Sequence, residues 1–127
     1  MTVDIHANWN GNELDILASP QGLLELVSLL RSGEGGSFKI KTGAYLGGTS
    51  NLSYIDIERS KSLLLLKVSG PSATLSGDDN ALSLFAKNLE NLRLMWAKGG
   101  EQHFHFDPES NPILMAPESD AFVVGPV

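Results

Sequence analysis

The sequence predicts an α+β fold: a mostly antiparallel sheet of six or seven strands with two helices packed on one face. Two long segments carry apolar residues at three- and four-residue steps, which is the spacing of one helical face. Most of the other apolar segments alternate with polar residues, as half-buried strands do. Short turns connect these strands, and short connections favour antiparallel neighbours because a parallel crossover needs a longer one.

The N-terminal part of the chain predicts a hairpin followed by a helix. Residues 3–9 and 13–18 flank the turn residues Asn10-Gly11-Asn12, which tolerate tight turns. Ser19 can cap the following helix, and Pro20 suits its first turn, where a missing amide hydrogen costs nothing. The predicted buried stripe of this helix is Leu23, Leu26, Val27 and Leu30.

The middle of the chain predicts a loop and a second hairpin. Residues 37–42 form a short strand, and residues 43–51, with three glycines, form a flexible loop. Residues 52–59 and 62–69 lie on either side of a polar turn, so we expect them to pair with each other.

One stretch in the C-terminal half predicts a long helix followed by a short strand. The helix is capped by Ser76 or Asp78 and ends at Gly99-Gly100. Its predicted buried stripe is Leu82, Phe85, Ala86, Leu89, Leu92 and Trp96. Residues 101–107 then alternate strictly, so we expect Phe104 and Phe106 to face the helix. The polar face of this strand is Glu101, His103, His105 and Asp107. A proline-bearing loop and an apolar strand at residues 121–124 complete the chain.

The composition is that of a globular protein whose charge is unevenly placed. The 127 residues are enough for one domain, residues 1–127, and the longest apolar run, residues 63–66, is too short to span a membrane. The chain has no cysteine, which fits the cytoplasm. The net charge is −6, and residues 101–127 contain five acids and no Lys or Arg. This argues against nucleic-acid binding and favours a basic protein partner, although the charge would also serve solubility alone.

The two halves of the chain resemble each other at an offset of 58 residues. Leu17-Ala18-Ser19 followed by an apolar helix start corresponds to Leu75-Ser76-Gly77 followed by another. This suggests an internal repeat of residues 3–58 and 62–124, although any well-capped strand-to-helix junction gives the same pattern.

A histidine pair is the sharpest candidate for chemistry. His103 and His105 lie two apart on a strand and so point to the same side, and imidazoles bind zinc, iron or copper. With Glu109 they resemble the first metal-binding motif of the cupins, but the flanking glycines and a second histidine motif are absent. If the first strand were a neighbour, His6 would join them. A metal-binding protein or small metal-dependent enzyme using His6, His103, His105 and Glu109 is therefore one alternative. A solvent-facing contact surface without metal is the favoured interpretation, and no cofactor is predicted.

A wider resemblance covers most of the chain. It consists of the helix start Ser19-Pro20-x-Gly22-Leu23-x-x-Leu26, the strand with His103 and His105, and the proline-bearing loop and apolar strand of residues 112–124. In this layout the chain resembles the immunity protein 32 family of bacterial polymorphic toxin systems. The resemblance implies a cytoplasmic protein that binds and blocks a cognate toxin without catalysis.

The resemblance also implies a contact surface and leaves one further alternative. The candidate contact residues are Glu101, His103, His105, Asp107 and Glu109. A basic toxin would complement the acids among them. The other alternative is a structural homo-oligomer in which an edge strand pairs with a copy of itself.

Overall fold

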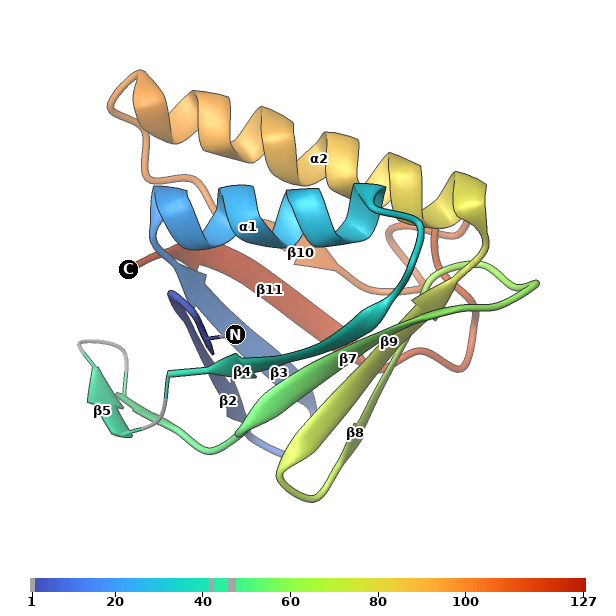
Figure 1. Ribbon diagram of the computed structural model, residues 1–127, viewed down its shortest axis with the longest axis horizontal. Coiled ribbons are helices and arrows are strands. Elements are labelled where there is room, and N and C mark those ends of the chain that lie inside the picture. Colours follow the sequence, from blue (N-terminus) through green and yellow to red (C-terminus); the bar gives the residue numbers. More distant parts are fainter. Residues whose placement is uncertain (1, 42, 46–47) are drawn as a thin grey trace.

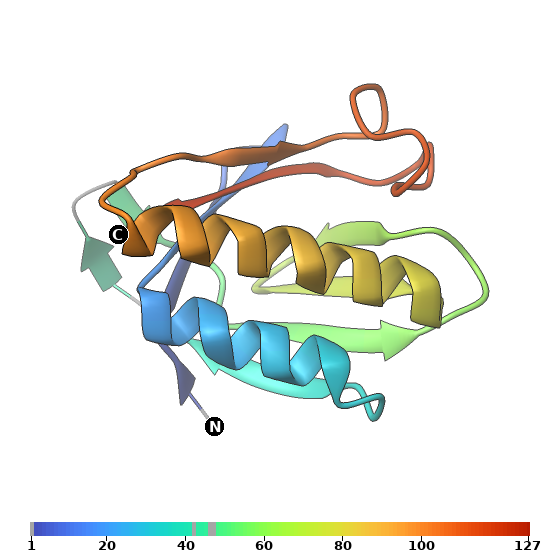
Figure 2. The same ribbon diagram turned by 90° about the horizontal axis from the view of Figure 1, so that it is seen from above.

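The computed structural model describes residues 2–41, 43–45 and 48–127. Two helices, α1 (Pro20–Arg31) and α2 (Asp79–Ala97), pack against each other on one side of the strands (Figures 1 and 2). Seen from above in Figure 2, they run side by side in opposite directions. The predicted α+β class with two helices is therefore right.

The predicted single, mostly antiparallel sheet is wrong, because most of the strands form two separate mixed sheets. The first sheet, in spatial order, is β1 (Thr2–Val3), β4 (Gly36–Ile40), β7 (Tyr54–Arg59), β9 (Ser72–Gly77) and β8 (Leu65–Ser69). The second is β10 (Phe104–Phe106), β11 (Ala121–Pro126), β3 (Glu13–Ala18) and β2 (Ile5–Trp9). With only Asp4 between β1 and β2, one extended segment passes from the first sheet to the second.

Parallel pairs arise where a strand from elsewhere in the sequence lies beside a hairpin, as β7 does beside the β8–β9 hairpin and β11 does beside the β2–β3 hairpin. β9 lies between β7 and β8, parallel to the first and antiparallel to the second. β11 likewise lies between β10 and β3 and runs parallel to β3. The predicted pairing of residues 52–59 with residues 62–69 is therefore wrong, since both segments border β9. Alternation along a strand records which face is buried but does not identify the neighbouring strand.

The local elements around α1 and α2 agree with the predictions. β2 and β3 form the expected hairpin, where the Asn10 side-chain oxygen accepts the backbone N–H groups of Asn12 and Glu13 at 2.8 and 2.9 Å. Ser19 caps α1 and Asp78 caps α2, each accepting a backbone N–H of the first turn. All the predicted stripe residues of both helices are buried.

The predicted loop at residues 43–51 contains two strands. β5 (Gly43–Tyr45) and β6 (Gly48–Ser50) pair with each other in a small antiparallel sheet. Residue 42 of the predicted strand 37–42 and residues 46 and 47 of the predicted loop lie outside the described residues. The glycine content of this stretch indicated a loop. Glycine weakens a strand but does not prevent two strands as short as β5 and β6 from pairing.

Asp4, at the junction of the two sheets, gives the chain an acid-sensitive contact. The Lys41 ammonium lies 2.6 Å from its carboxylate. The hydrogen bond from Lys41, followed by one from Ser19, lowers the pKa of the Asp4 carboxyl from its ordinary value of 3.8. A carboxyl with a depressed folded-state pKa adds stability above its ordinary pKa, and this stability disappears as the pH falls through the folded-state pKa.

Replacing Lys41 by methionine is therefore expected to cost stability at neutral pH and not in acid. The loss should stay below about 1 kcal/mol, because both side chains are partly exposed and solvent screens the pair. Urea unfolding of wild type and Lys41→Met at about pH 7 and about pH 2 measures it. An equal difference between the two proteins at both pH values would contradict the role of the ion pair.

Candidate functional site

The phenylalanines and histidines around β10 point to opposite sides, as predicted. Phe106 is 2% exposed, and its ring lies 5.1 Å from Phe85 of α2 and 4.9 Å from Phe122 of β11. Phe104 is half-buried against the same core. His103 and His105 are exposed. The aromatic contacts fix β10 beneath α2 and leave the imidazoles free to meet a partner.

The acidic candidate residues lie at the two ends of this strand. Glu101 and Glu109 are exposed, whereas Asp107 is half-buried. The Asp107 carboxylate accepts the backbone N–H of Ser110 at 2.7 Å, and its own N–H donates to the Asn111 side chain at 3.2 Å. Asp107 therefore closes the turn after β10, while Glu101 and Glu109 are available for contacts.

His103 is positioned by a glycine on the neighbouring strand. A Cβ atom placed on Gly125 of β11 would lie 2.1 Å from the His103 ring, so the imidazole lies directly over the Gly125 backbone. Any larger residue at position 125 would push the ring away. The sequence predicts the end of a strand at Gly125, but not this contact.

A pocket lies along β10 and includes residues that the sequence analysis missed. The β10 pocket has a volume of about 280 Å³, and its lining residues are Asn88, His103, Phe104, His105, Phe106 and Asn111. Asn88 comes from α2 and Asn111 from the turn after β10, so three segments meet here. Asn88 lies three residues after the buried Phe85, and this position marks it in the sequence as the polar border of the buried stripe.

The outer edge of β10 is open. Among the described residues, no backbone hydrogen bond reaches the outer edge of Phe104–Phe106 from another segment. By contrast, the outer edge of β8 is bonded by residues 114–120, and that of β2 by residues 41, 51 and 52. An open strand edge presents unpaired N–H and C=O groups that another chain can bond.

The structure separates His6 from the histidine pair. His6 pairs with Leu17 on the next strand, and Leu17 pairs with Gly125. Continuing the pairing of β10 with β11 by one residue places His103 opposite Gly125, so His6 and His103 lie in the same row across the sheet. The row spans the four strands of the second sheet, so about 14 Å separate the backbones of β2 and β10. Within the described part of the chain, no three side chains of the His, Asp and Glu types gather as metal ligands would. The proposed neighbourhood of His6 with His103 and His105 is thus not formed.

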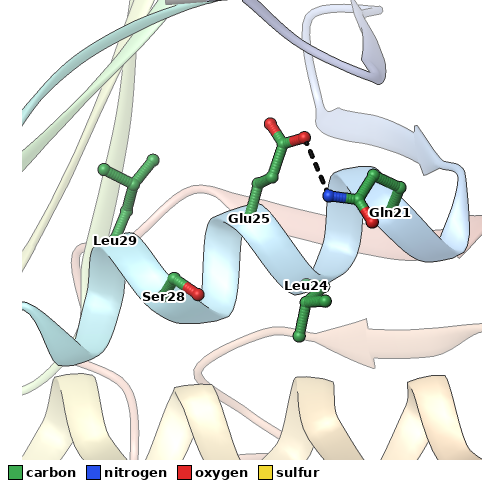
Figure 3. Close-up of a pocket in the computed structure, with 5 residues that line it drawn as sticks. All are labelled: Gln21, Leu24, Glu25, Ser28 and Leu29. Carbon is green, nitrogen blue, oxygen red and sulfur yellow. Dashed lines mark hydrogen bonds between the residues drawn. The ribbon is translucent and has the colours of Figure 1, made fainter.

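A second hollow lies on α1. It has a volume of about 360 Å³ and is lined by Gln21, Leu24, Glu25, Ser28 and Leu29 (Figure 3). All five side chains come from one helix, and the Gln21 amide donates to Glu25 at 3.3 Å. These residues form a shallow helix surface with no convergence of groups from different segments, in contrast to the β10 pocket.

Comparison with known protein families matches part of the chain. Neither described helix combines the length and hydropathy that a membrane-spanning helix requires. No curated protein and no solved structure matches the chain significantly. The family model described as immunity protein 32 matches residues 72–125, which include β9, α2, β10 and most of β11. The predicted resemblance to the immunity protein 32 family is therefore confirmed over this part of the chain, and it supports a general role as an immunity-type inhibitor of a protein toxin.

Proposed function

We propose that this chain inhibits a cognate toxin by binding it directly, without catalysis, through the surface around β10. The observation that carries the proposal is the family match over residues 72–125, because this segment contains every candidate contact residue. Those residues are Glu101, His103, His105, Asp107 and Glu109. A non-catalytic inhibitor needs an exposed surface of fixed shape, and the packing of Phe106 against Phe85 and Phe122 holds β10 rigidly in place.

The charge of this region supports a basic toxin as the partner. Residues 101–127 contain five acids and no Lys or Arg, and Glu101 and Glu109 are exposed at the two ends of the strand. An acidic surface accelerates the approach of a basic partner and disfavours acidic competitors. We place the encounter in the cytoplasm, which suits a chain without cysteine.

Reversing two of these charges is expected to slow binding. In the variant Glu101→Lys with Glu109→Lys, the association rate with the toxin should fall at least roughly tenfold at low salt, since charges at the rim of an interface act mainly on association. The partner used is the product of a toxin gene adjacent to this one. Surface plasmon resonance at several salt concentrations measures the rate, and rescue of growth in cells expressing the toxin reports inhibition.

A matched control changes the same amount of charge elsewhere. Glu34 and Glu58 are exposed and lie outside the β10 surface, so Glu34→Lys with Glu58→Lys should leave most of the association rate intact. Equal losses in both variants would show that only net charge matters and would refute the assigned surface. Failure of the wild-type chain to bind the adjacent toxin or to rescue growth would refute the inhibitor role.

A further inference from the structure

We propose that the β10 pocket binds an arginine side chain of the protein partner. This inference rests on the proposed function for the source of the arginine, but the pocket can be tested without the toxin. It extends the contact surface from β10 to Asn88 on α2 and Asn111 in the following turn, which are not among the contact residues predicted from the sequence.

The size of the pocket favours a single side chain. Its volume of about 280 Å³ lies just below the range of pockets that enclose a drug-sized ligand, roughly 300–1,000 Å³. The pocket is also open along β10, whose outer edge makes no backbone hydrogen bond with another described segment. A side chain projecting from a bound protein segment fits both observations better than a separate small molecule does.

The charge around the pocket favours a cation. No Lys or Arg lines it. Asp107 directly follows the lining residue Phe106, and the exposed Lys87, directly before Asn88, is the one cation next in sequence to a lining residue. In the sequence, Glu101 lies two residues before the lining segment of residues 103–106, and Glu109 lies two residues before Asn111. An anionic group in this position would be repelled by these carboxylates, whereas a cation would be attracted.

The lining groups favour guanidinium over ammonium. Asn88 is half-buried, and within the described part of the chain its side-chain amide has no hydrogen-bond partner, so its oxygen remains available as an acceptor. Asn111 supplies a second amide oxygen, which already accepts the Asp107 N–H at 3.2 Å and keeps one lone pair for a further donor. The half-buried ring of Phe104 supplies an aromatic surface. A guanidinium is planar, presents several N–H donors in fixed directions and stacks on aromatic rings, whereas an ammonium is a compact, strongly hydrated charge.

The experiment titrates the full-length, ¹⁵N-labelled chain with L-argininamide, which carries the arginine side chain without a carboxylate. The side-chain amide signals of Asn88 and Asn111 should shift together and saturate. L-Lysinamide should bind at least about threefold more weakly, and succinate should leave these signals unchanged. Absence of a saturable shift with L-argininamide, or equal shifts with succinate, would overturn the proposal.

Variants at one position test the pocket in opposite directions. Asn88→Lys should weaken L-argininamide binding at least about tenfold, and Asn88→Asp should strengthen it, because they place opposite charges beside the guanidinium. Asn91→Lys, one turn further along α2 and outside the lining, is the matched control and should bind as wild type does. Circular dichroism verifies folding. If Asn88→Lys fails to fold, the affinities of Asn88→Asp and Asn91→Asp for L-argininamide are compared instead. Equal affinities in each matched pair would refute the assigned pocket.

The toxin distinguishes a failure of this inference from a failure of the proposed function. If L-argininamide binds the pocket but the toxin does not bind the chain, the pocket stands and the inhibitor role falls. If the toxin binds wild type and Asn88→Lys equally well, the inhibitor role stands and the arginine site is refuted.

Discussion

Replacing Phe85 by alanine is expected to lower the free energy of unfolding by about 3–5 kcal/mol, the cost of removing a large ring from a packed core. Phe85 is 1% exposed, and its ring meets Phe106 edge-on at 5.1 Å and Phe122 at 5.6 Å. The three rings join α2 to β10 and β11. Because a domain of this size is stable by only about 5–15 kcal/mol, the variant should lose a large part of its stability.

Chemical denaturation followed by circular dichroism measures the effect of Phe85→Ala. The matched control is Leu84→Ala, at the neighbouring position, where the side chain is 38% exposed and the loss should be below about 1 kcal/mol. Similar losses in the two variants would contradict the role of the aromatic cluster. If Phe85→Ala stays folded, the resonances of β10 should also shift, since the contact of the Phe106 ring with Phe85 is gone.

Replacing Gly22 by alanine is expected to destabilise the chain by about 1–3 kcal/mol, although the same change normally stabilises a helix. A Cβ at position 22 would lie 2.2 Å from the backbone carbonyl oxygen of Asp4. That carbonyl also accepts the N–H of Ser19 at 3.2 Å, so the start of α1 is tied to the junction of the two sheets. Backbone atoms held in this way cannot move aside cheaply, and the helix must shift instead.

The matched control for Gly22→Ala is Gln21→Ala, one position earlier on the exposed side of α1. Its stability should stay within about 0.5 kcal/mol of wild type, as is usual for surface positions. Thermal and urea unfolding of both variants provide the comparison. A neutral or stabilising Gly22→Ala would show that α1 can move away from Asp4 without cost and would contradict the close approach.

The arrangement of the strands supports the interpretation of the chain as two repeats, at an offset one residue longer than predicted. We propose that β2, β3, α1, β4 and β7 correspond to β8, β9, α2, β10 and β11. The sheet orders β4-β7-β9-β8 and β10-β11-β3-β2 then become equivalent. The caps Ser19 and Asp78 differ by 59 residues, and an offset of 59 also aligns buried Leu26 with buried Phe85. The offset of 58 instead aligns Leu24 with Leu82, one exposed and one buried.

This proposal has a test in the sequences of relatives. If the halves arose by duplication, relatives should show similarity between their own halves at this corresponding alignment, strongest at the buried helix positions. Relatives whose halves align better in another register would contradict it.

The sequence by itself determined the two helices with their caps and the orientation of the faces around β10. The apolar spacing of α1 and α2, their caps and the alternation around Phe104 and Phe106 all depend on interactions within a few residues, so they are readable from the chain. The same alternation predicted correctly that His103 and His105 are exposed.

Only the tertiary structure decided which strands are neighbours and which side chains converge. β9 separates β7 from β8, and β11 joins the two ends of the chain within one sheet. The β10 pocket and the contact between His103 and Gly125 follow from these pairings. The physical reason is that a strand's pattern records the burial of its two faces, whereas its edges carry the same N–H and C=O groups in every strand. Packing of the whole chain therefore selects the partner for each edge.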